Sequence, residues 1–162
     1  SDITKQHRLK TKENIKREFI KSAAIENYFA WERYKKFNKE ENSQLEKGTI
    51  PDDFLRSMKN TFADYKDIFF GKDISTYYYI SDVSKRVISI LKERKEKPDE
   101  WWDEHGKEIW EGMLCALTHE IDDEKKNLIK TAYSYENLKS PTNDTPSLDE
   151  FSSRPQFLRW FT

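Results

Sequence analysis

The chain has 162 residues and a formal net charge of −1, with 35% hydrophobic and 36% charged residues. This charge balance argues against a dedicated nucleic-acid-binding protein, and no apolar stretch approaches the ~20 residues that a membrane-spanning helix requires, so no membrane insertion is expected. Aromatic residues make up 14% of the chain, which argues against intrinsic disorder because Phe, Tyr and Trp bury large areas with few residues.

The first predicted element is a long helix from Lys12 to about Asn38, which follows a polar leader at residues 1–11. Its apolar residues fall in two adjacent rows on one face, as helical periodicity requires. One row holds Ile15, Phe19 and Ala23, and the other holds Ile20, Ala24, Tyr28, Trp31 and Tyr34. Residues 39–49 are expected to form a polar connection.

A second helix is predicted to begin at Ile50-Pro51-Asp52-Asp53, because proline and acidic residues favour the first turn, and to stop at Gly71. Its expected buried residues are Phe54, Met58, Phe62, Tyr65 and Phe69. A third helix is expected from Ser75 to Arg94. Its core face is expected to hold Ile80, Val83, Val87, and Ile90 or Leu91.

The fourth predicted helix starts at Pro98, ends near His119 or Glu120, and carries three of the five Trp residues. Its apolar stripe contains Trp102, Ile109, Trp110, Met113, Leu114 and Leu117. Acidic residues crowd its N-terminal part, where the helix dipole favours negative charge. Burying these large side chains would contribute several kcal/mol, so we expect this helix at the centre of the core, with Trp110 packed near Phe29 or Phe62.

A short fifth helix is predicted from Asp123 to Tyr133, followed by a long loop from Ser134 to Arg154 and a last helix that begins at Pro155. The loop includes Asn143-Asp144-Thr145, a weak match to an N-glycosylation acceptor. Because the final helix lasts barely two turns, the chain is expected to be a piece cut from a longer protein. Four Gly and five Pro leave room for uninterrupted helices, and alternating β patterns are nearly absent. We therefore predict an all-α fold over residues 1–162, a bundle of about four long helices plus short ones.

The sequence predicts neither a catalytic site nor a metal or cofactor site. His105, Glu108 and Glu111 share a helix face, but the chain lacks the paired Glu-x-x-His pattern of ferritin-type sites. It has no phosphate-binding glycine loop and no nucleophile accompanied by a base. Cys115, the single cysteine, lies in an apolar run with acidic neighbours and is predicted to be a small buried hydrophobe. A non-enzymatic protein is expected.

Charge is distributed unevenly along the chain. Residues 1–97 carry 22 Lys/Arg against 16 Asp/Glu, whereas residues 98–162 carry 7 against 14. Either the two parts attract each other when they pack, or the basic part presents a surface for an acidic partner such as a sulfated glycan or a negatively charged receptor. For the glycan hypothesis the candidate binding residues are Lys10, Lys12, Lys16, Arg17 and Lys21.

Four segments carry a family resemblance: residues 19–31, 50–68, 101–117 and 154–161. In this order they resemble homology blocks of the Duffy-binding-like domains found in the variant erythrocyte membrane adhesins of the malaria parasite. The resemblance implies the central helical subdomain of a larger domain. The motifs Lys66-Asp-Ile-Phe-Phe-Gly-Lys-Asp-Ile74, Tyr79-Ile-Ser-Asp-Val-Ser84 and His105-Gly-Lys-Glu-Ile-Trp-Glu-Gly112 resemble the beta class most.

The resemblance implies a non-enzymatic adhesion module of a parasite surface protein, displayed on the infected erythrocyte and involved in cytoadherence and antigenic variation. It implies a host endothelial receptor, which for the beta class is intercellular adhesion molecule 1. The family is rich in disulfides, whereas this chain has a single cysteine, which puts full receptor binding by the chain in question. Two alternatives stay open: a structural scaffold without receptor binding of its own, useful as a target for antibodies, and a binder of sulfated glycans.

Overall fold

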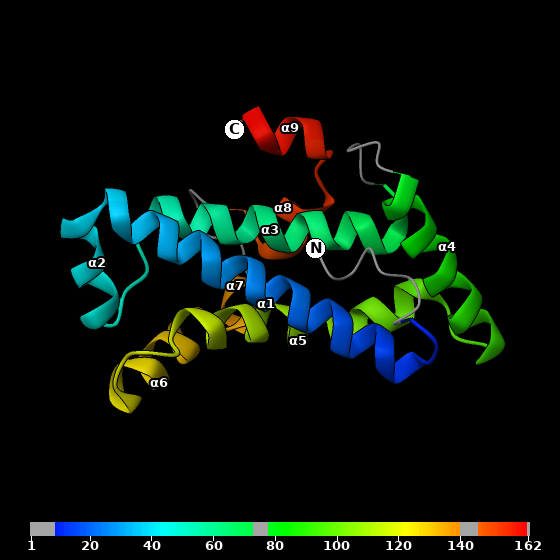
Figure 1. Cartoon of the computed structure of the whole chain (residues 1–162), viewed down its shortest axis with the longest axis horizontal. Coiled ribbons are helices and arrows are strands. Elements are labelled where there is room, and N and C mark those ends of the chain that lie inside the picture. The colour runs from blue at the N-terminus through cyan, green and yellow to red at the C-terminus, as the bar shows by residue number, and fades with distance from the viewer. Residues whose placement is uncertain (1–8, 73–77, 140–145, 162) are drawn as a thin grey trace.

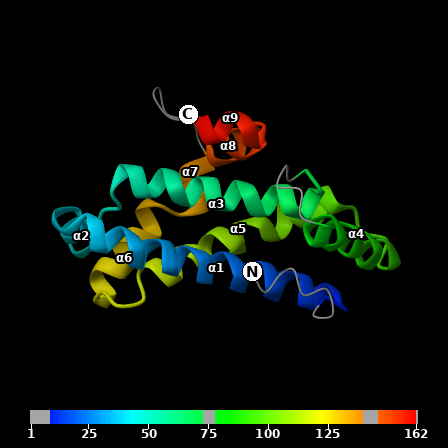
Figure 2. The ribbon, with the colours of Figure 1, turned by 45° about the horizontal axis from the view of Figure 1, so that its top comes forward.

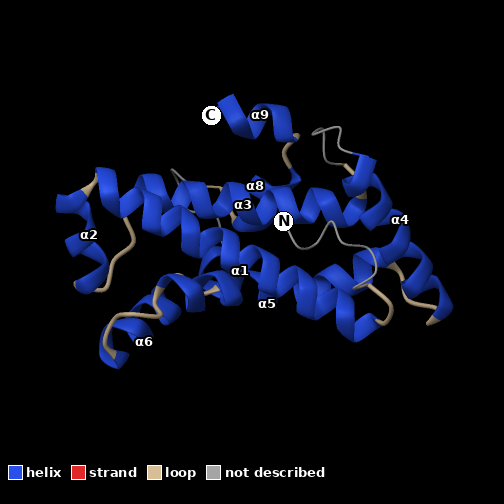
Figure 3. Cartoon of the chain, viewed as in Figure 1, coloured by secondary structure: helices blue, strands red, loops and turns tan. Residues whose placement is uncertain are grey.

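The computed structural model describes residues 9–72, 78–139 and 146–161, and within these ranges the regular structure is helical with no strand (Figure 3). The body is formed by the three longest helices, α1 (Lys12–Phe37), α3 (Asp52–Phe70) and α5 (Pro98–Leu117) (Figure 1). The all-α prediction is therefore confirmed.

Helices α1 and α5 run in the same direction, and α3 runs opposite to both (Figures 1 and 2). Two ion pairs show the parallel register. Lys16 near the start of α1 lies 3.0 Å from Glu108, whereas Lys35 near its end lies 3.9 Å from Glu120, just beyond α5. The two helices therefore face each other along most of their length.

Shorter helices close the two ends of this body. Helix α4 (Tyr78–Glu93) lies at one end, while α2 (Lys39–Glu46) and α6 (Asp123–Ala132) lie at the other (Figure 2). The chain then returns through α7 (Tyr135–Lys139), and both α8 (Leu148–Ser153) and α9 (Gln156–Phe161) pack against α3.

Helix α1 begins with a capping box. The Thr11 hydroxyl accepts a hydrogen bond from the Asn14 amide at 3.2 Å, and the Asn14 side chain accepts one from the Thr11 amide at 3.1 Å. The first predicted row is buried, but in the second row Trp31 alone is buried and the others lie at the edge of the core. The predicted polar leader is wrong at Leu9, which is fully buried, and residues 1–8 lie outside the described part of the chain.

Helix α3 confirms its predicted stripe, since all five expected residues are at most 2% exposed. Gly71 ends the helix with a left-handed φ of +74°, a conformation that glycine adopts without steric cost. In α4 the predicted Val83, Val87, Ile90 and Leu91 are buried, whereas the expected start at Ser75 and the side chain of Ile80 lie outside the described residues.

Helix α5 begins at Pro98 as predicted but ends two to three residues earlier than expected. Thr118 is the C-cap residue of α5, because its amide makes the last helical hydrogen bond, to the Leu114 carbonyl at 3.0 Å, and its hydroxyl also donates to that oxygen at 2.8 Å. The Thr118 backbone, at φ −97° and ψ 12°, departs from helical geometry, and the helix ends there. The predicted apolar stripe of α5 is buried throughout.

Two segments predicted as connections contain helices. Residues 39–49 include α2, whose Leu45 is 2% exposed. The predicted loop at 134–154 includes α7 and α8, and α8 begins with a capping box in which Ser147 and Glu150 bond each other's backbone amides at 3.1 and 3.2 Å. Leu148 and Phe151 then bury the short helix against the core. The possible acceptor at Asn143 lies outside the described residues.

Candidate functional site

The five basic residues of the glycan hypothesis do not form one free cationic patch. Lys12 forms an ion pair with Glu96, Lys16 with Glu108 at 3.0 Å, and Arg17 reaches its neighbour Glu18 at 3.6 Å. Lys10 and Lys21 are exposed and form no ion pair with a described residue. The pairs Lys16–Glu108 and Lys35–Glu120 support attraction between the basic and acidic parts of the chain.

Glu108 is the centre of a small polar cluster between α1 and α5. His105 Nδ1 lies 2.9 Å from Glu108 Oε2, and Lys16 Nζ lies 3.0 Å from Oε1. Burial raises the pKa of the Glu108 carboxyl, but the hydrogen bonds to His105 and Lys16 outweigh it and hold the pKa below its ordinary value. Within residues 9–72, 78–139 and 146–161, no group of three or more His, Cys, Asp and Glu side chains is placed to hold a metal ion.

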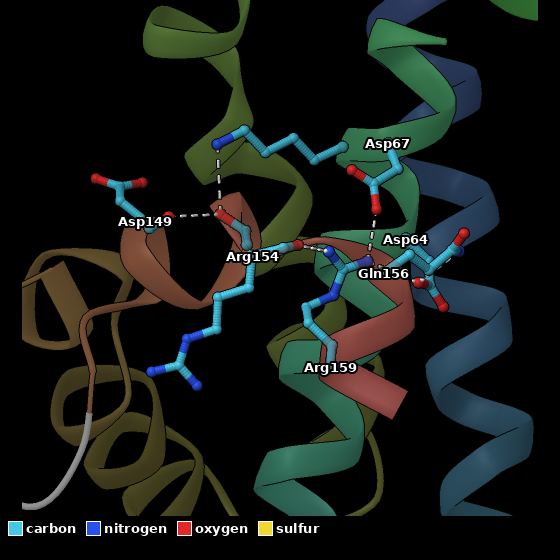
Figure 4. A network of polar contacts seen from close by, with 8 residues as sticks. Asp64, Asp67, Asp149, Arg154, Gln156 and Arg159 are labelled. Atoms are coloured by element: carbon cyan, nitrogen blue, oxygen red, sulfur yellow. Dashed lines mark hydrogen bonds and ion pairs between the residues drawn. The ribbon is translucent and has the colours of Figure 1, made fainter. Parts of the chain in front are cut away.

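The C-terminal helix is fastened to α3 by a buried ion cluster, formed by Arg159 with Asp64 and Asp67 (Figure 4). Arg159 Nη2 lies 3.1 Å from Asp64 Oδ1 and 2.5 Å from Asp67 Oδ2, and Arg159 Nη1 donates to the Arg154 carbonyl at 2.5 Å. The Gln156 side chain donates to Asp64 at 3.1 Å. Since the Arg159 side chain is 0% exposed, α9 is an integral part of the bundle.

Helix α8 is held from two sides. Tyr135 donates a hydrogen bond to Asp149 at 2.5 Å, and Lys66 donates to Ser152 at 3.4 Å. Burial, reinforced by the bond to Asp149, raises the pKa of Tyr135 above its ordinary value, while burial lowers that of Lys66. The segment around α8 is therefore structural, although sequence reasoning assigned it to a loop.

An apolar groove lies between α1 and α5 on the surface of the bundle. This α1–α5 groove has a volume of about 610 Å³. Its lining residues are Ile20, Ala24, Ile25, Tyr28, Phe29, Gly112, Cys115, Ala116 and His119. The sequence predicts that Trp110 packs near Phe29 or Phe62. The first alternative is wrong, because Phe29 is 55% exposed. The second is confirmed, because the ring centroids of Trp110 and Phe62 lie 5.9 Å apart.

Cys115 is exposed in this groove, so its prediction as a buried hydrophobe is wrong. It follows the buried Leu114 on the outward side of α5, next to Ala116, which is half-buried. Gly112 is needed where the helices meet, because a Cβ there would lie 2.8 Å from Ile20 Cγ2. Gly112 and Ala116, which also line the groove beside Cys115, are small and leave it open to solvent.

A second hollow lies between the end of α1 and the start of α3. This α1–α3 hollow has a volume of about 380 Å³ and is lined by Ala30, Arg33, Tyr34, Phe37, Asp53, Phe54 and Ser57. Its wall is fixed, since Tyr34 stacks on Trp31 at 5.4 Å and its hydroxyl shares its single proton between Glu41 and, at 2.7 Å, Asp53. Burial and these two carboxylates raise the pKa of Tyr34 above its ordinary value, so its hydroxyl stays protonated.

Phe37 stands at the rim of this hollow with 85% of its surface exposed. Sequence reasoning missed both Phe37 and the groove residues Ile25 and Phe29. The sequence did contain a signal for them. Ile25, Phe29, Arg33 and Phe37 follow one another at steps of four residues, which places them on one side of the helix, outside the two predicted core rows. Such apolar groups on a fixed surface are suited to binding without covalent chemistry.

Comparison with known proteins adds one match. The family model of the Duffy binding domain matches residues 1–159. Neither a curated protein nor a solved structure gives a match to the chain. In the described part of the chain, no helix has the length and apolar character needed to cross a membrane. Because the family match spans nearly the whole chain, the chain belongs to the Duffy binding domain family, whose members are adhesion modules that bind host-cell receptors.

Proposed function

We propose that this chain is an adhesion module of a malaria-parasite surface protein, displayed outside the infected erythrocyte, and that it binds a host endothelial receptor protein through the α1–α3 hollow. The observation that carries the assignment to this surface is Phe37, an aromatic side chain 85% exposed beside a hollow with rigid walls. Aromatic residues that insert into a partner supply much of the energy of protein interfaces.

The charges around Phe37 also suit a protein partner. Arg33 lines the same hollow and is exposed, while Asp53 contributes a carboxylate that already accepts a hydrogen bond from Tyr34. An apolar centre with charged residues of both signs at its rim is typical of protein interfaces. The motifs within residues 66–112 resemble the beta class, so intercellular adhesion molecule 1 is the first receptor to test.

Replacing Phe37 by Ala is expected to weaken receptor binding by more than about 1 kcal/mol, or at least roughly fivefold in Kd, without loss of folding. Phe37 is exposed, so its removal leaves no cavity in the core. Surface plasmon resonance on a panel of endothelial receptors, starting with intercellular adhesion molecule 1, measures the change.

The matched control is Ile88→Ala, because Ile88 is 46% exposed on α4 at the far end of the bundle. Its affinity should equal that of the unchanged chain. Binding that is equally strong in Phe37→Ala would reject this surface as the receptor contact. Two results would favour the scaffold hypothesis over ours: a chain that binds no receptor, or a whole adhesin whose receptor affinity is unchanged by every alanine substitution at an exposed position of this chain. Recognition by antibodies would then be the chain's remaining interaction.

Binding of a sulfated glycan is the second candidate, and it is supported by Lys10 and Lys21, which are exposed and pair with no carboxylate of the described residues. Because Lys12, Lys16 and Arg17 already contact carboxylates, we expect heparin retention to be weak and to vanish near physiological salt, about 0.15 M, where charges beyond ~8 Å are screened. Heparin chromatography of the unchanged chain and of a Lys10→Ala/Lys21→Ala variant tests this. Retention well above that salt concentration, abolished in the variant, would favour the glycan hypothesis.

A further inference from the structure

We propose that the α1–α5 groove is a self-association surface, on which a second copy of this chain docks about a two-fold axis that runs along the groove. This surface is separate from the α1–α3 hollow at Phe37, so the inference does not depend on the receptor assignment. Three features support it: the sizes of the side chains on the two walls, the charges of the two helices, and their parallel direction.

The two walls of the groove differ in side-chain size. Helix α1 contributes mostly large residues, namely Ile20, Ile25, Tyr28 and Phe29, together with Ala24. Helix α5 contributes mostly small ones, namely Gly112, Cys115 and Ala116. Ile25 and Phe29 project into solvent with 41% and 55% of their surfaces exposed, so they are available to fill a complementary surface.

The two helices also carry opposite charge. Within α1 there are seven Lys/Arg against four Glu, whereas α5 has six Asp/Glu against one Lys. Lys21 follows Ile20, and Glu111 precedes Gly112, the residue that Ile20 contacts. Because the helices are parallel, Lys21 and Glu111 lie within about 3 Å of each other in level along the groove, on opposite sides of it. Both are exposed, and neither forms an ion pair with a described residue of its own chain.

These features match a second copy because α1 and α5 are parallel. A two-fold rotation about an axis along the groove places α1 of each protomer over α5 of its partner, at the same level. Large side chains then meet small ones, and Lys21 of each protomer faces Glu111 of the other. A two-fold axis across the helices would instead place basic α1 against basic α1. A single partner surface thus complements both walls, which a uniformly acidic or uniformly basic partner cannot do.

Sedimentation equilibrium over a series of protein concentrations tests the proposal, with reducing agent present so that a disulfide between exposed Cys115 residues does not imitate a dimer. We expect a reversible monomer–dimer equilibrium. Lys21→Glu and Glu111→Lys should each weaken it about tenfold or more, because each places two pairs of like charges across the interface. An equimolar mixture of the two variants should regain dimers, since both charge pairs are then opposite.

Lys85→Glu is the matched control, because it makes the same charge change at an exposed position of α4. It should dimerise like the unchanged chain. Phe29→Ser should abolish dimers while circular dichroism shows a folded helical protein. A chain that stays monomeric at every concentration, charge variants that dimerise normally, or a mixture that stays monomeric would each overturn the proposal.

Discussion

Replacing Trp110 by Ala is expected to lower the free energy of unfolding by about 3–5 kcal/mol, a large share of the roughly 5–15 kcal/mol that stabilises a typical domain. Trp110 is 0% exposed, and its ring meets Phe62 edge-on at a centroid distance of 5.9 Å. Its Nε1 donates a hydrogen bond to the Tyr133 carbonyl at 2.8 Å. The substitution removes this burial, opens a cavity and leaves the carbonyl without its donor.

Urea unfolding followed by circular dichroism at 25 °C measures the loss. Receptor binding by Trp110→Ala should fall only in proportion to the unfolded fraction, because the side chain has no exposed surface. The exposed control Ile88→Ala should stay within about 0.5 kcal/mol of the unchanged chain. An unchanged urea midpoint together with lost receptor binding would show that Trp110 contacts the receptor directly.

Replacing Asp67 by Ala is expected to cost about 3–5 kcal/mol, because it removes one partner of a buried ion pair. Arg159 Nη2 lies 2.5 Å from Asp67, and the Arg159 side chain is 0% exposed. Asp64, at 3.1 Å and 32% exposed, would remain as a weaker carboxylate partner. A buried guanidinium that loses its closer carboxylate should release α9 from α3, so the variant should also become sensitive to proteolysis near Arg154.

Two further variants test whether this cost comes from the unpaired charge. Asp67→Leu combined with Arg159→Met removes both members of the pair and should recover much of the lost stability. Glu32→Ala breaks a partly exposed surface pair with Lys35, 2.7 Å long, and should change stability by less than about 1 kcal/mol. A loss for Asp67→Ala no larger than that for Glu32→Ala would mean that the cluster does not hold the C-terminal helix.

The sequence by itself determined the long helices and their inner faces. Periodic apolar residues define one side of a helix wherever that side is covered along its whole length, as at Phe54, Met58 and Phe62 in α3. Local signals placed the ends, because Pro98 and Gly71 act through their own backbone conformations. The short helix α8 also had such a signal, the capping box of Ser147 and Glu150, within a segment whose polar composition indicated a loop.

Tertiary structure alone decided which of the remaining residues are exposed. Cys115 and Phe29 lie in apolar stretches, yet no described element covers the side of the α1–α5 pair on which they stand. Arg159 is a surface residue by its type, but it is buried because Asp64 and Asp67, more than ninety positions earlier, meet it. Lys12 and Lys16 are not buried, but their carboxylate partners also come from distant segments. Periodicity predicts on which face of its own helix a side chain lies. Whether that side chain is exposed, and which residue it pairs with, depends on which other segments pack against that face.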